Sequence, residues 1–138
     1  MATEQSPDAS VQDALVQEGL QTLGVAFLCD WDALAFLYRH SPSLATAAQL
    51  APLIGYDKAE IGVSLHRLAT LGLIQRSRVS QGIRIYRYTE PPEPGRHSCL
   101  RSLMSLAQNR TGRLLLLKHL KHPVPGLRRR RNSGLRLA

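Results

Sequence analysis

The stretch that decides the fold is Leu68-Ala69-Thr70-Leu71-Gly72-Leu73-Ile74-Gln75-Arg76. Apolar residues leading into it recur at spacings of four, three and three, the pattern of one buried helix face: Ile61, Leu65, Leu68 and Leu71. Gly72 stands where a helix commonly ends in the left-handed conformation that glycine adopts readily. The pattern then changes to one typical of a strand. The sequence therefore predicts a helix over residues 57–71 that turns sharply into a strand.

The residues after Gly72 predict a β-hairpin. Segments 73–79 and 83–89 have strand patterns, and Ser80-Gln81-Gly82 between them is typical of a turn. Along the second segment, side chains should alternate between two sides, with Ile83, Ile85 and Arg87 on one and Arg84, Tyr86 and Tyr88 on the other. The hairpin would form an arginine-bearing wing over about residues 73–89.

The residues before this helix predict three further helices. Gly19 and Gly24 weaken the first proline-free segment, so we expect one helix to end near Gly24 and a second to span residues 30–40. Asp30 should be the N-cap of the second helix, and Asp57 that of the helix over residues 57–71. Another helix should cover about residues 44–53 and stop at Gly55. The order helix, helix, turn, helix, hairpin is that of a winged helix-turn-helix.

The composition fits one small domain with a basic surface. The chain has 138 residues, 43% of them hydrophobic, and 18 Lys and Arg against 10 Asp and Glu, for a formal net charge of +8. Residues 1–38 contain no Lys or Arg, so the positive charge lies in the remainder. Such a remainder attracts polyanions, because each neutralised phosphate releases counterions.

The cellular compartment is predicted from the absence of targeting and membrane segments and from the two cysteines. The N-terminus shows no basic leader before an apolar stretch, and the apolar run 114–117 is too short to cross a bilayer. Cys29 and Cys99 stand far apart, and Cys29 falls in an apolar run where it should be buried. We expect a cytoplasmic protein with no membrane partner.

The segment from Leu68 to Arg76 resembles the end of the recognition helix in bacterial and archaeal repressors of the MarR and ArsR types. In those families a leucine, three variable residues, then Gly-Leu-Ile and a basic residue join that helix to the wing. The resemblance covers residues 30–89. It implies a mostly α fold with a small β-hairpin, and a transcription regulator that binds double-stranded DNA as a homodimer.

The resemblance also implies which residues contact DNA. The N-terminal half of a recognition helix reads base edges in the major groove, and an arginine-rich wing contacts the backbone or the minor groove. The candidates are Lys58, Glu60 and Val63 for bases, Arg67 for a phosphate, and Arg76, Arg78 and Arg84 beside or within the wing. Where typical members carry Ser, Thr and Arg, this helix begins with Ala59, Glu60, Gly62 and Val63. A winged-helix module that binds a protein is therefore the alternative.

The C-terminal segment leaves two arrangements open. After the linker Pro91-Pro92-Glu93-Pro94-Gly95, residues 97–120 predict one leucine-rich helix. It would either pair with its copy in a dimer or fold back on its own chain. The dimer candidates are Leu100, Leu103, Ala107, Leu114 and Leu117. A small-molecule effector could bind between this helix and the winged domain.

The sequence thus divides into residues 1–29, an N-terminal helical extension; 30–90, the winged domain; 91–122, linker and C-terminal helix; and 123–138, a basic tail. The run of arginines at 128–131 would either contact phosphates or stay solvated. His119 with His122, and His97 with Cys99, each supply two ligands where a closed zinc site needs four. We expect no metal, no cofactor and no enzymatic activity, since phosphate-loop, HExxH and GxSxG motifs are missing.

Overall fold

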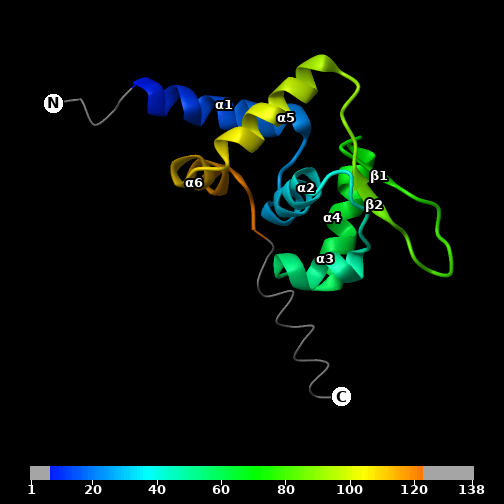
Figure 1. Ribbon diagram of the computed structural model, residues 1–138. Helices are drawn as coiled ribbons and strands as arrows, with labels where there is room; N and C mark the ends of the chain where they lie inside the picture. The colour runs from blue at the N-terminus through cyan, green and yellow to red at the C-terminus, as the bar shows by residue number, and fades with distance from the viewer. Residues whose placement is uncertain (1–6, 123–138) are drawn as a thin grey trace, which may run out of the picture.

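The computed structural model describes residues 7–122, which form six helices and one antiparallel two-stranded sheet (Figure 1). The elements in chain order are α1 (Pro7–Leu23), α2 (Leu28–Arg39), α3 (Ala47–Ile54), α4 (Lys58–Thr70), β1 (Ile74–Arg76), β2 (Tyr86–Tyr88), α5 (Pro94–Leu106) and α6 (Arg110–His119). Helices α2, α3 and α4 with the hairpin form the winged helix, and α1 packs against α5 and α6. No helix in this range is long and apolar enough to cross a membrane.

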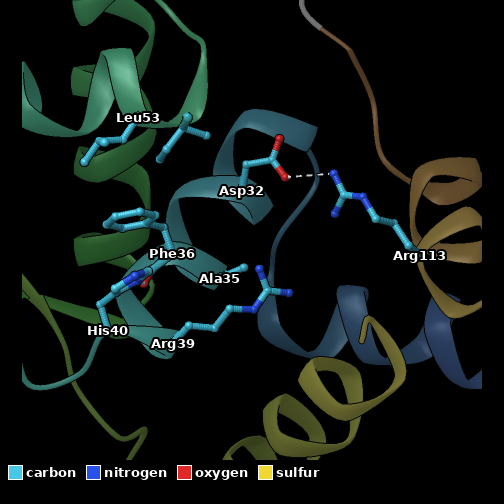
Figure 2. A pocket seen from close by; sticks show the side chains of 8 residues that line it. Asp32, Ala35, Phe36, Arg39, His40, Leu53 and Arg113 are labelled. Carbon is cyan, nitrogen blue, oxygen red and sulfur yellow. Dashed lines mark hydrogen bonds and ion pairs between the residues drawn. The ribbon is translucent and has the colours of Figure 1, made fainter. Parts of the chain in front are cut away.

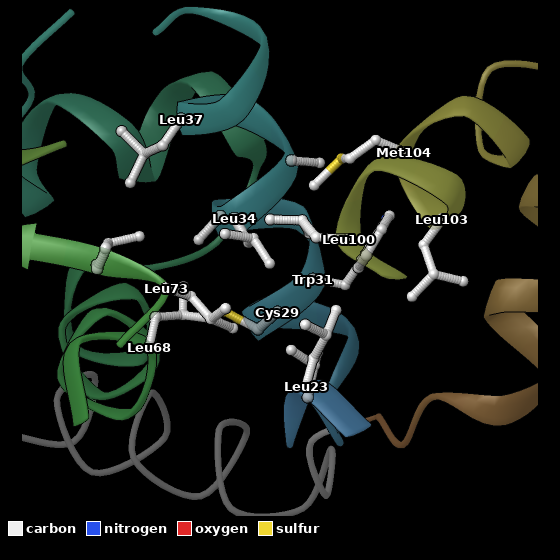
Figure 3. Close-up of a cluster of buried hydrophobic side chains, with 14 of the residues drawn as sticks. Leu23, Cys29, Trp31, Leu34, Leu37, Leu68, Leu73, Leu100, Leu103 and Met104 are labelled. Atoms are coloured by element: carbon white, nitrogen blue, oxygen red, sulfur yellow. The ribbon is translucent and has the colours of Figure 1, made fainter. Parts of the chain in front are cut away.

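Helix α2 lies at the centre of the core (Figure 3). Its side chains Trp31, Leu34 and Leu37 are almost fully buried. They form one cluster with Leu68 of α4 on one side and Leu100 of α5 on the other. Because the same cluster includes residues of α1 and α6, the winged helix and its flanking helices share one continuous hydrophobic core.

The ends of helix α4 confirm the sequence prediction. The Asp57 carboxylate caps α4 by accepting the backbone N–H of Glu60 at 2.9 Å. At the other end, Gly72 has φ of +78°, the left-handed conformation expected after the helix. The chain then enters β1, whose residues Ile74–Arg76 pair with Tyr86–Tyr88 of β2. The predicted order of helices and hairpin is confirmed.

The predicted start of α2 at Asp30 is wrong, because a distant segment shapes that start. The backbone N–H of Leu28 donates to the carbonyl of Lys121, and the N–H of Lys121 donates to the carbonyl of Ala26, both at 2.8 Å. This short pairing holds the chain extended at Phe27, which is the N-cap residue, so α2 begins at Leu28. Asp30 lies in the first turn of α2 and is buried.

The helix α3 also begins later than expected. Thr46 and Gln49 form a reciprocal capping box, in which each side chain accepts the backbone N–H of the other residue. This cap sets the helix start at Ala47, and Leu44 remains an exposed residue before it.

The wing has shorter strands than the sequence predicted. The ladder of β1 and β2 holds three residue pairs, and residues 77–85 form a loop, here called the wing loop. In this loop the Ser77 hydroxyl accepts the N–H of Ile85, so a side chain replaces a ladder partner. The predicted alternation is confirmed: Tyr86 is buried, while Ile83 and Ile85 are exposed.

The prediction of one helix over residues 97–120 is wrong. The helical segment is interrupted between α5 and α6, where the Asn109 side chain caps α6 by accepting the N–H of Gly112 at 2.7 Å. A Cβ on Gly112 would meet the carbonyl oxygen of Leu106, so only glycine allows the two helices to approach this closely. The break turns Leu116 and Leu120 back into the core.

One ion pair fixes helix α4 against α2. The Arg67 guanidinium of α4 donates to both carboxylate oxygens of Asp30, at 2.8 and 2.9 Å. The Asp30 side chain is 2% exposed, and the Arg67 guanidinium also lies 4.6 Å from the ring centroid of Phe27. The hydrogen bond to Asp30 raises the pKa of Arg67. A bidentate pair of this kind fixes orientation as well as distance.

We predict that Arg67→Met lowers the free energy of unfolding by about 3 kcal/mol, the lower end of the range for breaking a buried pair, because Arg67 is partly solvated. The measurement is urea unfolding followed by circular dichroism. Arg113→Met is the control: Arg113 lies 3.5 Å from Asp32 in a more exposed pair and should cost less than about 1 kcal/mol. Equal losses for the two variants would contradict the structural role of Arg67.

Candidate nucleic-acid interface

Helix α4 presents one face to solvent and packs the rest against the chain. Its buried side chains are Ile61, Ser64, Leu65 and Leu68. The opposite side, here called the outer face of α4, consists of Ala59, Gly62, Val63, His66 and Thr70. Val63 is 53% exposed, near the middle of this face. The exposed residue Lys58 stands at the start of the helix.

Glu60 and Arg67 do not lie on the outer face, although the sequence analysis placed both among the DNA contacts. One carboxylate oxygen of Glu60 is buried. Burial, with smaller contributions from nearby carboxylates including Glu60, raises the pKa of Cys29 in α2 to about 11. Arg67 binds Asp30 of the same helix α2. Residues 60, 64 and 67 therefore form a second row of side chains turned toward the chain, beside the apolar row that the sequence predicted.

The wing arginines occupy different surroundings. Arg76 of β1 donates from Nη1 to Nδ1 of His66 at 2.9 Å, which ties the base of the wing to the outer face of α4. Arg78 is exposed in the wing loop, and Arg84 is half-buried there. Arg87, which the sequence analysis did not select, is held by Gln75 across the strand pair at 2.7 and 2.9 Å. His66 was also not selected, although helical periodicity alone places it beside Val63.

A groove separates the wing from the start of α3 and α4. It has a volume of about 410 Å³, and two cationic side chains, Lys58 and Arg84, stand in its wall. The remaining lining residues are Thr46, Ala47, Ala48, Val79, Gly82, Ile83 and Tyr86. Arg76, bonded to His66, places a further positive side chain in the second half of the outer face of α4. Cations so placed suit the phosphates of a nucleic-acid backbone.

A second hollow of about 350 Å³ lies between α2, α3 and α6 (Figure 2). Arg113 reaches from α6 toward Asp32 of α2, with Nη2 and Oδ1 3.5 Å apart. The Tyr56 hydroxyl donates to the other Asp32 oxygen at 2.7 Å, and burial raises the pKa of Tyr56 above its ordinary value. This hollow lies between the winged helix and the C-terminal helices, where the sequence analysis left room for an effector. Such a ligand stays a prediction.

The five dimer candidates fall into two groups. Leu100, Leu103 and Ala107 of the α5 region are buried within the chain, where α5 packs against α1, so folding back accounts for their apolar character. Leu114 on α6 is 55% exposed, and Leu117 is half-buried. The arginine run at 128–131 lies outside the described residues.

Two of the three histidines singled out by spacing, His97 and His119, have partners within the chain. His97 lies 3.1 Å from Glu90, and His119 lies 2.9 Å from Asp13. The bonds from His119 and Lys118 lower the pKa of Asp13. Across residues 7–122, His, Cys, Asp and Glu side chains form no group of three or more that could hold a metal ion.

Comparison with known proteins agrees with this geometry. The model of the MarR family matches residues 23–82, which run from the end of α1 through α2, α3 and α4 into the wing loop. No curated protein and no solved structure gives a significant match. The matched segment contains the whole helix-turn-helix and the first half of the wing. Residues 23–82 of this chain are therefore similar to the MarR family.

Proposed function

We propose that the protein binds double-stranded DNA as a homodimer, with the outer face of α4 in the major groove and the wing on the adjacent backbone or minor groove. The observation that carries this proposal is the placement of cations around a neutral helix face. Lys58 and Arg84 share one groove beside the start of α4, and Arg76 is bonded to His66 further along the same helix. Affinity then comes mainly from phosphates, and sequence preference from the helix.

A second candidate is a winged-helix module that binds a protein. The exposed side chains Val79, Ile83 and Ile85 on the wing loop favour it, because apolar residues contribute little to phosphate binding. An apolar segment with acidic neighbours would fit such a wing. The test below separates the two candidates, since it measures DNA affinity directly.

We predict that Arg78→Ala with Arg84→Ala weakens binding to a random-sequence DNA duplex about tenfold or more, and lowers the salt slope by roughly 2, because two phosphate contacts are lost. Fluorescence anisotropy across a salt series measures both. The matched control is Arg101→Ala with Arg110→Ala, which removes the same charge from exposed positions on α5 and α6.

Equal losses in the two double variants would mean that net charge alone sets the affinity. No binding by the unmodified protein, even at low salt, would contradict the DNA proposal and leave the protein-binding module.

The dimer is proposed to form through α1 and α6. Val11 and Leu15 are each 57% exposed and lie one turn apart on the same face of α1. Helix α1 packs against α6, which carries the exposed residue Leu114. Large aliphatic side chains exposed on adjacent helices are typical of an interface. A symmetric pair joined here would carry two recognition helices to a palindromic site.

We predict that Leu15→Glu converts a dimer to a monomer, because a carboxylate placed in an apolar interface must lose its hydration. Sedimentation equilibrium measures the mass. Leu44→Glu is the control, since Leu44 is 60% exposed before α3, outside α1 and α6, and the variant should remain dimeric. A monomeric unmodified protein, or a dimeric Leu15→Glu variant, would refute this interface.

A further inference from the structure

The N-terminal half of the outer face of α4 has no side chain suited to a bidentate hydrogen bond with a base. Ala59, Gly62 and Val63 carry no polar atom beyond the backbone. The two polar residues that the sequence analysis assigned to bases lie off this face: Glu60 has a buried carboxylate oxygen, and Lys58 stands in the wall of the groove beside the wing. Arg67, which it assigned to a phosphate, binds Asp30. The pairings that read guanine, adenine or cytosine in the major groove need Arg, Lys, Asn, Gln or an acid.

The polar residues in the second half of the face, His66 and Thr70, each have one hydrogen bond within the chain. The Thr70 hydroxyl donates to the backbone carbonyl of His66 at 3.0 Å. The His66 ring accepts from Arg76 through Nδ1. The most prominent group on the face is then the Val63 side chain, an aliphatic residue that is 53% exposed.

Gly62 supplies a separate observation about the same surface. A Cβ at this position would meet no atom within 4 Å, so packing inside the chain gives no reason for glycine here. Glycine within a helix costs about 1 kcal/mol relative to alanine. Gly112, by contrast, is required by the Leu106 carbonyl oxygen. The benefit of Gly62 must therefore lie outside the chain, and close approach of a ligand to the helix backbone is the benefit that glycine offers.

We propose that the outer face of α4 recognises thymine methyl groups in the major groove, with Val63 and Ala59 as apolar contacts and Gly62 allowing the base edge to approach closely. The C5-methyl of thymine is the apolar group that the four bases present in this groove. The preferred target is an A·T-rich duplex. This inference rests on the proposed function, which places α4 in the major groove.

The test removes the methyl groups and leaves the phosphates in place. Binding of the full chain is measured by anisotropy to an alternating dA-dT duplex and to the same duplex with deoxyuridine for thymidine. We expect about fourfold weaker binding to the deoxyuridine duplex for each methyl contacted, with the salt slope unchanged. In an alternating dG-dC duplex, replacing cytosine by 5-methylcytosine should strengthen binding.

Three variants assign the effect to residues. Val63→Ser should bring the ratio of the thymidine and deoxyuridine affinities close to one. Leu53→Ser is the control, because Leu53 is also exposed, at 66%, but lies near the end of α3, outside the outer face of α4 and the wing, and it should keep the ratio. Gly62→Ala should leave the free energy of unfolding equal or higher, since its Cβ meets open space, and should still weaken DNA binding.

The outcomes separate this inference from the proposed function. Salt-dependent binding with equal affinity for the thymidine and deoxyuridine duplexes would overturn the methyl-reading inference alone. The inference would also be overturned if the Val63→Ser variant kept the ratio of the thymidine and deoxyuridine affinities, or if the Gly62→Ala variant bound DNA normally. Absence of binding to every duplex at low salt would overturn both proposals.

Discussion

The ion pair between Asp30 and Arg67 sets which side of helix α4 faces outward. Once the Arg67 guanidinium is bonded to a carboxylate buried in α2, α4 cannot rotate about its axis without leaving that charge unpaired. The pair sits beside Phe27, whose extended backbone is held by Lys121 from the end of α6. The first turn of α2, the side of α4 and the end of the flanking helices therefore meet at one point.

Arg96 of α5 supplies a second link from the flanking helices to the winged domain. Its guanidinium donates to the carbonyl of Leu23, at the end of α1, and to that of Leu71, at the end of α4. Carbonyls at helix ends lack partners within the helix, so a cation there completes their bonding. The flanking helices thus contact both the start of α2 and the end of α4, and a change in their packing would alter the position of α4.

Local signals in the sequence were sufficient for much of the fold. Asp57 and Gly72 act within one turn of the residues they cap, so their roles were predictable. The start of α2 was not, because it depends on Lys121, which is remote in sequence. The break before α6 had a signal in Asn109, a good N-cap residue, but the leucines around it fit one continuous helix equally well. The candidate site was harder to predict than the fold. Helix periodicity identified the buried apolar face of α4. It could not show that Glu60 and Arg67 are also turned toward the chain, because that depends on their contacts with α2.

The central claim is that the outer face of α4 and the wing together form the DNA-binding surface. The most direct measurement is amide chemical-shift mapping of the full-length protein titrated with an A·T-rich duplex. If this surface binds DNA, the largest shifts should occur at residues 58–66 and 76–85, with little change on the exposed side of α5. Shifts concentrated on α5 and α6, with residues 58–66 unchanged, would contradict it.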